Sequence, residues 1–188
     1  MRRTHAPVLA ALVLGAAFAF GGDVPRAPGA PLLGTKDYVA RPAVPADGRY
    51  EYGTGPSRFA DLYLPKGGRL PHRLVVFFHG GCWMSRFGLE PVGAFGRALA
   101  DEAGVAVLSV EYRRIGEEGG GFPGTFLDAG AALDFVEELS QQAPASPRGV
   151  PVAGHSAGAH LALWLAARAG LPADDPLRTA VRIRPARV

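Results

Sequence analysis

The sequence predicts an α/β fold with three layers, in which helices cover both faces of a mainly parallel sheet. Strand-like and helix-like segments alternate from Arg58 onward. Two of the strand-like segments, 74–78 and 105–110, are almost continuously apolar, as expected of strands that are covered on both faces. A turn at 154–158 that contains two glycines then joins a short apolar segment to a helix-like one. This alternation is typical of parallel strands joined by crossover helices.

Each element has its own local signal. The segment 58–64 alternates apolar and polar residues well enough for a strand, and the turn-forming sequence 65–68 ends it. Apolar residues at helical spacing indicate a helix after Pro123, and Gly104 ends the helix that precedes the second apolar run. The expected strands are 58–64, 74–78, 105–110 and 150–153, and the expected helices are 92–103, 125–139 and 159–169.

The N-terminal segment has the pattern of a secretory signal. Two arginines follow Met1, an uncharged stretch of 17 residues runs over 6–22, and Ala17-Phe18-Ala19 supplies a cleavage site at residue 19. We expect a secreted or periplasmic protein with no stable membrane insertion once residues 1–19 are removed. The alternative is an anchor formed by the uncleaved signal, but the stretch is shorter than the ~20 residues that span a bilayer.

The rest of the chain divides into a linker and one domain. Residues 20–48 are rich in proline and glycine, as linkers are, and residues 49–188 carry the expected strands and helices. At 188 residues, of which 48% are hydrophobic, the whole chain is long enough for one domain with a core.

Charge and cysteine content argue against several partners and cofactors. The net charge is +3, and the 18 arginines and 2 lysines are scattered, so the sequence has no basic cluster suited to nucleic acid. The lone cysteine, Cys82, has no partner for an internal disulfide, and the five dispersed histidines show no metal-ligand spacing. We expect no metal and no cofactor.

The turn Gly154-His155-Ser156-Ala157-Gly158 has the sequence form of a nucleophile elbow. A strand-to-helix turn this tight strains the backbone at the serine, and small residues on either side leave room where larger side chains would collide. The hydroxyl of Ser156 is then expected above the edge of the sheet. Ser156 is therefore the candidate catalytic nucleophile.

A second glycine motif follows the strand that ends at Phe78. The sequence His79-Gly80-Gly81-Cys82-Trp83 places adjacent glycines where backbone N–H groups can approach a substrate oxygen. Such donors stabilise the negative charge that the oxygen gains in acyl transfer, and each contributes about 3–4 kcal/mol in other enzymes. The expected oxyanion hole comprises Gly80, Gly81, Cys82 and Ala157, the residue after the candidate nucleophile.

With these motifs, the chain resembles the α/β-hydrolase superfamily, in the branch of esterases, lipases and arylformamidase-like enzymes. The resemblance covers about residues 50–171 and includes four segments in the order that this branch shows: 61–65, 79–83, 111–114 and 154–161. It implies a serine hydrolase that cleaves carboxylic esters or related small acyl compounds through an acyl-enzyme on Ser156. In this family the triad acid and histidine come from loops after later strands.

The sequence departs from the family's pattern after the elbow. Only 32 residues follow Ser156, and they contain His160, Asp174 and Asp175 but no later histidine. We therefore expect the N-terminal portion of the fold, without its C-terminal strands and with no strand in 179–188. The alternatives are an inactive or binding-only fragment and, for a complete protein, an arylformamidase or a peptidase of the prolyl-oligopeptidase type.

The remaining candidates have a structural reading beside the functional one. Trp83 could line a substrate pocket or pack against the tight loop that contains it. Phe122 could line the same pocket or lead into the next helix. His79, His155 and His160 are expected to pack or to form structural hydrogen bonds rather than to act as the base. Glu111 and Arg113 are expected to form an ion pair with each other at the end of their strand.

Overall fold

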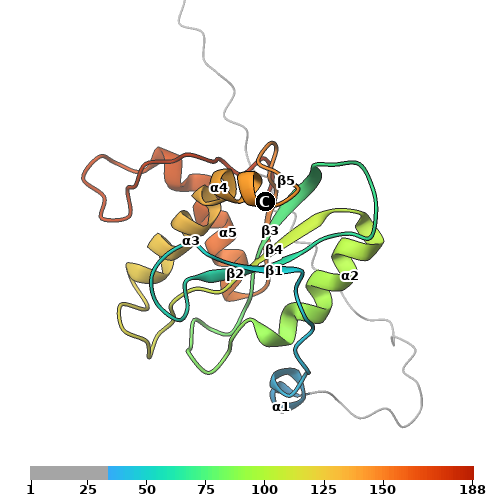
Figure 1. Ribbon diagram of the computed structural model, residues 1–188. Helices are drawn as coiled ribbons and strands as arrows, with labels where there is room; N and C mark the ends of the chain where they lie inside the picture. Colours follow the sequence, from blue (N-terminus) through green and yellow to red (C-terminus); the bar gives the residue numbers. More distant parts are fainter. Residues whose placement is uncertain (1–33) are drawn as a thin grey trace, which may run out of the picture. The chain divides into compact units, whose positions relative to one another are not determined.

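The computed structural model describes residues 34–188 and shows one mixed β-sheet between layers of helices (Figure 1). The strands are β1 (Gly48–Glu51), β2 (Phe59–Tyr63), β3 (His72–Phe78), β4 (Ala106–Val110), β5 (Ala145–Ser146) and β6 (Val152–Gly154). Their order is β1-β2-β4-β3, with β5 and β6 both paired to β3. Strands β3, β4, β5 and β6 are parallel, whereas β1 and β2 join the sheet in antiparallel pairs.

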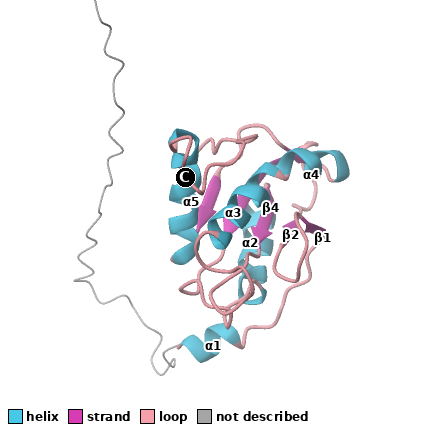
Figure 2. Cartoon of the chain, turned by 90° about the vertical axis from the view of Figure 1, so that its left-hand side faces the viewer, coloured by secondary structure: helices cyan, strands magenta, loops and turns pink. Residues whose placement is uncertain are grey.

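The helices form the two outer layers. They are α1 (Thr35–Val39), α2 (Gly93–Ala103), α3 (Gly124–Asp134), α4 (Val136–Gln142) and α5 (Ala157–Ala167), with short 3₁₀ turns at Glu90–Val92 and Arg168–Gly170. Helix α2 lies on one side of the sheet, and α3, α4 and α5 lie on the other (Figures 1 and 2). The predicted three-layer α/β/α arrangement is thus confirmed.

The alternation of side chains along the strands divides the core into two clusters. In β3, the side chains of Val76 and Phe78 join the larger cluster with α3, α4 and α5, whereas Phe77 joins the smaller cluster with α2. Strand β4 behaves in the same way, because Leu108 and Val107 belong to different clusters. The continuous apolar runs of the sequence therefore reflect burial on both faces.

Three elements are absent from the sequence-based prediction. Strand β1 has no apolar run, because it pairs only with β2 and its residues alternate between half-buried and exposed. Strand β5 is only two residues long. Helix α1 lies inside the predicted linker 20–48, of which the structure describes residues 34–48. The expected helix 125–139 appears as two consecutive helices, α3 and α4, that meet at Phe135.

As expected, no strand forms in 179–188, but the backbone of this segment pairs with the chain at β6 through an isolated bridge. Arg187 forms a parallel bridge with Pro151. The N–H of Val152 donates to the carbonyl of Arg187 at 2.9 Å, and the N–H of Ala186 donates to the carbonyl of Val150 at 2.9 Å. These bonds use backbone groups alone, so an arginine-rich segment without strand-like alternation can make them.

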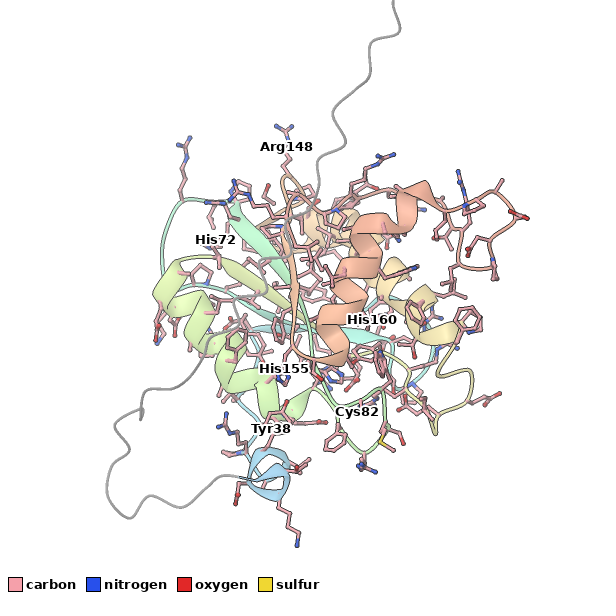
Figure 3. The ribbon with its side chains drawn as sticks, turned by 180° about the vertical axis from the view of Figure 1, so that it is seen from behind. Tyr38, His72, Cys82, Arg148, His155 and His160 are labelled. Atoms are coloured by element: carbon pink, nitrogen blue, oxygen red, sulfur yellow. The ribbon has the colours of Figure 1, made fainter. Side chains whose placement is uncertain are left out.

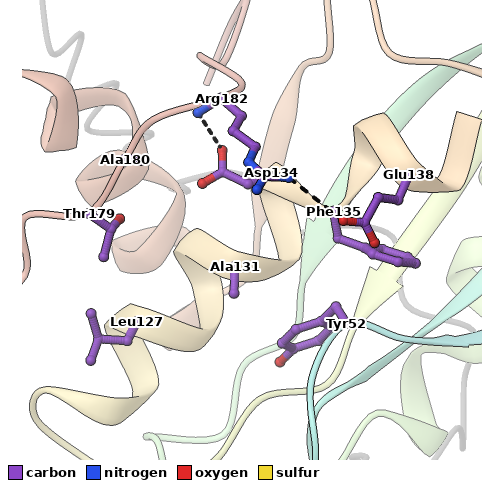
Figure 4. Close-up of a pocket in the computed structure, with 9 residues that line it drawn as sticks. All are labelled: Tyr52, Leu127, Ala131, Asp134, Phe135, Glu138, Thr179, Ala180 and Arg182. Carbon is purple, nitrogen blue, oxygen red and sulfur yellow. Dashed lines mark hydrogen bonds and ion pairs between the residues drawn. The ribbon is translucent and has the colours of Figure 1, made fainter.

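The half-buried carboxylate of Asp134 holds this segment in place (Figure 4). Oδ1 of Asp134 accepts hydrogen bonds from Nη2 of Arg168 at 2.5 Å and from the N–H groups of Arg182 and Ile183 at 3.0 Å each. The guanidinium of Arg168 also donates to the carbonyl of Ile183 at 3.1 Å. The side chain of Ile183 is consequently inserted into the main core cluster.

The remaining expectations concern the signal, membrane insertion and metal binding. The predicted signal, residues 1–19, lies outside the described residues. Within 34–188, no helix has the length and apolar character required to cross a membrane. The same residues hold no group of three side chains suited to bind a metal ion.

Candidate active site

Ser156 stands at the turn between β6 and α5, in a backbone conformation that few residues adopt. Its φ is 52° and its ψ is −117°, and the residue is exposed. A conformation of this kind costs about 1–3 kcal/mol and persists only where the surrounding structure enforces it. The strain that the sequence motif predicts is therefore present at the candidate nucleophile.

Two glycines enforce the turn by allowing backbone segments to touch. A Cβ on Gly158 would collide with the carbonyl oxygen of Phe78, at the end of β3. A Cβ on Gly154 would collide with the carbonyl group of Gly158, across the turn. Any larger residue at either position would push the start of α5 away from the sheet.

The glycine loop after β3 lies directly against this turn. A Cβ built on Gly80 would lie 3.2 Å from Cβ of Ser156 and 2.8 Å from the carbonyl oxygen of His155. The next three residues, Gly81, Cys82 and Trp83, have φ values of 128°, 52° and 56°. Three successive positive φ angles curl the loop, so the chain turns back beside Ser156 instead of continuing away from the sheet.

The curled loop is tied to the segment after β4. The N–H of Ile115 donates to the carbonyl of Trp83 at 2.7 Å, and the N–H of Ser85 donates to the carbonyl of Ile115 at 3.0 Å. The sequence analysis did not single out Ile115, because a lone isoleucine after a strand carries no recognisable signal. Its role depends on its backbone, which any residue except proline could provide.

Four backbone N–H groups of the glycine loop and the elbow have no hydrogen-bond acceptor in the described part of the chain. These are the N–H groups of Gly80, Gly81, Cys82 and Ala157. They belong to the two backbone segments that meet at Gly80 and Ser156. Figure 3 shows Cys82, His155 and His160 at the same end of the molecule, opposite His72 and Arg148. That end is where the parallel strands β3, β4 and β6 finish.

A buried network supports the loop from below. His79 is fully buried, and its Nδ1 and Nε2 lie 2.7 Å from the carbonyl oxygen of Gly80 and 2.9 Å from Oε1 of Glu111. The ring of Tyr112 stacks on His79 at a centroid distance of 4.5 Å, and its hydroxyl donates to the carbonyl of His79 at 2.7 Å. Burial, together with the neighbouring charge of Glu111, raises the pKa of Tyr112, so this hydroxyl remains a donor.

The expected ion pair between Glu111 and Arg113 does not form. Glu111 instead contacts Nη1 of Arg114 at 3.2 Å and accepts from the N–H of Leu89 at 2.9 Å. Arg113 forms two hydrogen bonds of 2.8 Å with the fully buried carboxylate of Asp128 on α3. The two side chains leave the strand end in different directions, which the sequence order alone does not reveal.

The histidines near Ser156 do not act on it in this geometry. His155 and His160 are exposed, and the ring of His160 contacts the rings of Trp83 and Phe126. Within the described part of the chain, no hydrogen bond joins the hydroxyl of Ser156 to a histidine or a carboxylate.

An apolar hollow of about 240 Å³ opens beside the curled loop. Trp83 and Phe122, the two candidate pocket residues, both line it. The sequence analysis did not assign Phe126, Ile115 or His160 to the pocket. Phe126 and His160 lie on separate helices, α3 and α5, so only their tertiary packing brings them together.

Comparison with known proteins gives a consistent pattern. Residues 75–187 match a family described as "alpha/beta hydrolase fold". The "Probable isoprenylcysteine alpha-carbonyl methylesterase ICME" of Oryza sativa subsp. japonica is 35% identical over 112 residues, which are 59% of this chain and 26% of that protein. "Carboxylesterase NlhH" of Mycobacterium tuberculosis is 36% identical over 116 residues, which are 62% of this chain and 35% of that protein.

Solved structures show the same arrangement. The hyperthermophilic esterase of the archaeon Pyrobaculum calidifontis superposes with a TM-score of 0.55 at 31% identity, covering 67% of this chain and 42% of that chain. A truncated carbohydrate esterase from gut microbiota has a TM-score of 0.60 at 22% identity, covering 73% of this chain and 53% of that chain, and so supports the fold alone. The chain spans 22 to 35% of the length of the curated relatives it matches.

Proposed function

The chain belongs to the α/β-hydrolase fold family, and from that premise we propose that it carries the nucleophile and oxyanion hole of an esterase acting on carboxylic esters. The observation that carries the proposal is the meeting of two strained backbone segments. An exposed serine with a φ of 52° lies against a glycine loop whose N–H groups have no acceptor among residues 34–188.

In the proposed reaction, the hydroxyl oxygen of Ser156 attacks the ester carbonyl carbon. The carbonyl oxygen becomes negatively charged and is held by the N–H of Ala157 and by those of the Gly80–Cys82 loop. Collapse of this intermediate breaks the bond to the alcohol, which leaves with the proton that the Ser156 hydroxyl loses on attack, and the acyl group remains on Ser156. Water then attacks the acyl-enzyme, releasing the carboxylic acid and restoring the serine hydroxyl.

The names of the relatives support the substrate class. The matched relatives named above are a methylesterase and a carboxylesterase, and both names describe ester cleavage. The hollow lined by Trp83 and Phe122 supplies an apolar surface beside the glycine loop, as a site for a non-polar acyl or alcohol group requires. We therefore propose that residues 34–188 contain the nucleophile Ser156, the oxyanion donors and the two pocket residues Trp83 and Phe122.

A second candidate keeps the fold without the activity. It is favoured by the geometry around Ser156, because no histidine within residues 34–188 is hydrogen-bonded to its hydroxyl. A serine without a base is a poor nucleophile. The oxyanion donors would then bind a carboxylate or ester carbonyl without turnover.

Labelling by a fluorophosphonate separates the two candidates, because it requires an activated serine but no substrate fit. We expect the full chain to be labelled at Ser156 and the Ser156→Ala variant to be unlabelled. Absence of labelling in a sample with a folded circular-dichroism spectrum would support the binding-only candidate.

We also propose that the protein is exported. The support is the charged start and apolar stretch of residues 1–22. N-terminal sequencing of the protein recovered outside the cytoplasm should begin at Phe20, and an intact Met1 in that fraction would contradict cleavage.

A further inference from the structure

The apolar hollow beside the curled loop is built largely from aromatic rings of three separate segments. Trp83 comes from the curled loop, Phe122 and Phe126 come from the start of α3 and the loop before it, and His160 comes from α5. Gly121, Ile115 and Thr125 complete the lining. The hydroxyl of Thr125 is already engaged, because it donates to the carbonyl of Arg113.

The rings are fixed by edge-to-face contacts. The ring of His160 lies 5.5 Å from that of Trp83 at 88°, and 5.7 Å from that of Phe126 at 77°. Phe122 and Phe126 meet at 6.0 Å and 68°. A nearly perpendicular set of rings presents both edges and faces to a guest, which is the surface that another aromatic ring prefers.

The hollow and the candidate active site are built from the same two segments. His160 lies in the first turns of α5, which begins directly after Ser156. Trp83 follows the oxyanion loop directly, and the loop itself contacts Ser156 at Gly80. A carbonyl group at Ser156 therefore lies between the two segments that contribute Trp83 and His160 to the hollow.

The size of the hollow restricts what enters it. An apolar cavity of about 150 Å³ in another protein holds one benzene molecule. The present hollow of about 240 Å³ has room for one such ring with a short linker. A long alkyl chain would extend past the rim, where Phe122 is 68% exposed.

We propose that this hollow binds a single aromatic ring of the ester substrate, so that Trp83, Phe122, Phe126 and His160 determine specificity. The proposal rests on the proposed esterase function, and it narrows the substrate class to esters that carry an aryl group near the carbonyl. Contacts between aromatic rings add a gain of roughly 2- to 10-fold in affinity per pair beyond what burial of the same area provides.

The two tryptophans of the chain make the site directly observable. Trp83 lines the hollow, and Trp164 contacts Phe126 at a centroid distance of 5.3 Å. A Trp164→Phe variant leaves Trp83 as the single tryptophan, whose emission is excited selectively at long wavelength. Its emission is titrated with benzyl alcohol and, in parallel, with cyclohexylmethanol, which has a similar size and the same hydroxyl but no aromatic face.

We expect benzyl alcohol to bind roughly 3- to 10-fold more tightly than cyclohexylmethanol, and Phe122→Ala to remove most of that difference. The matched control is Phe95→Ala, which removes a ring that is 48% exposed on α2, on the opposite face of the sheet. This control should leave both affinities unchanged. Equal affinity for the two alcohols, or a preference that survives Phe122→Ala, would overturn the aromatic site.

The titration does not require turnover, so its outcome is separate from that of the labelling experiment. Ring preference in a protein that a fluorophosphonate does not label would overturn the esterase and leave a ring-binding site. Labelling without ring preference would overturn the aromatic site alone. If both hold, benzyl alcohol should slow the labelling of Ser156, and the slowing should be weaker in Phe122→Ala.

Discussion

The carboxylate of Glu111 lies 2.9 Å from Nε2 of His79, and both side chains are buried. This contact joins the ends of β3 and β4 beneath the oxyanion loop. Arg114 and the N–H of Leu89 complete the surroundings of the carboxylate. The donors around the carboxylate of Glu111 compensate for the burial of its charge. Removing the carboxylate would leave buried donors without an acceptor.

Glu111→Ala should therefore destabilise the protein strongly. Loss of the carboxylate leaves the ring of His79 and the N–H of Leu89 buried without their acceptor, and breaking a buried charged set in this way costs about 3–5 kcal/mol of unfolding free energy. Urea denaturation measures the change. Glu118→Ala, an exposed glutamate nearby, should change the same free energy by less than about 0.5 kcal/mol. Similar midpoints for the two variants would contradict the role assigned to Glu111.

Gly158→Ala should disrupt the elbow. The added methyl group meets the carbonyl oxygens of Phe78 and His79, which belong to backbone and cannot rotate away. Overpacking of this kind costs about 1–3 kcal/mol, and the displaced α5 should also abolish fluorophosphonate labelling. Gly170→Ala is the control, because a methyl group there has no neighbour within 4 Å. An unperturbed, fully labelled Gly158→Ala protein would show that the turn does not need this glycine.

Asp134→Ala should release the C-terminal segment. The substitution removes the acceptor shared by Arg168, Arg182 and Ile183, and it leaves the guanidinium of Arg168 buried and unpaired. We expect a loss of about 3–5 kcal/mol and faster tryptic cleavage after Arg182. Glu138→Ala is the comparison, because it removes the neighbouring ion pair between Glu138 and Arg182. The two charged groups of that pair are 3.7 Å apart, and both side chains are more than half exposed. The effect of Glu138→Ala should be below about 1 kcal/mol, and equal proteolysis of the two variants would refute the difference.

Glu117 should make stability depend on pH. Burial alone would raise its pKa, but hydrogen bonds from Arg114 and Ser57 outweigh burial, and the pKa of Glu117 lies below its ordinary value of 4.5. A carboxylate with a depressed pKa stabilises the folded state above the ordinary value, and this contribution disappears as pH falls through the folded-state pKa. The difference in unfolding free energy between wild type and Glu117→Gln should thus be largest near neutral pH and shrink in acid.

Denaturation of both proteins at pH 7, 5 and 3 checks this. Glu118→Gln, at the exposed neighbouring position, provides the baseline. A wild-type advantage over Glu117→Gln that stays constant down to pH 3 would show that the carboxylate charge is not responsible.

The central strands and the helices could be predicted because their signals are local. Apolar runs such as 74–78 and helical spacing such as that around Leu133 depend only on neighbours in the chain. Strand β1 and the bridge between Pro151 and Arg187 gave no such signal, because backbone pairing at the edge of a sheet places few demands on side chains.

The amino-acid sequence by itself determined which residues are candidates for chemistry: Ser156 between its glycines, and the glycine loop after Phe78. Glycines at these positions are dictated by close backbone approach, which leaves a recognisable pattern in the chain. Only the tertiary structure decided the partners of Glu111 and Arg113 and the aromatic lining of the hollow. Those contacts join residues on different strands and helices. Which side chains meet there depends on three-dimensional packing and not on their separation in sequence.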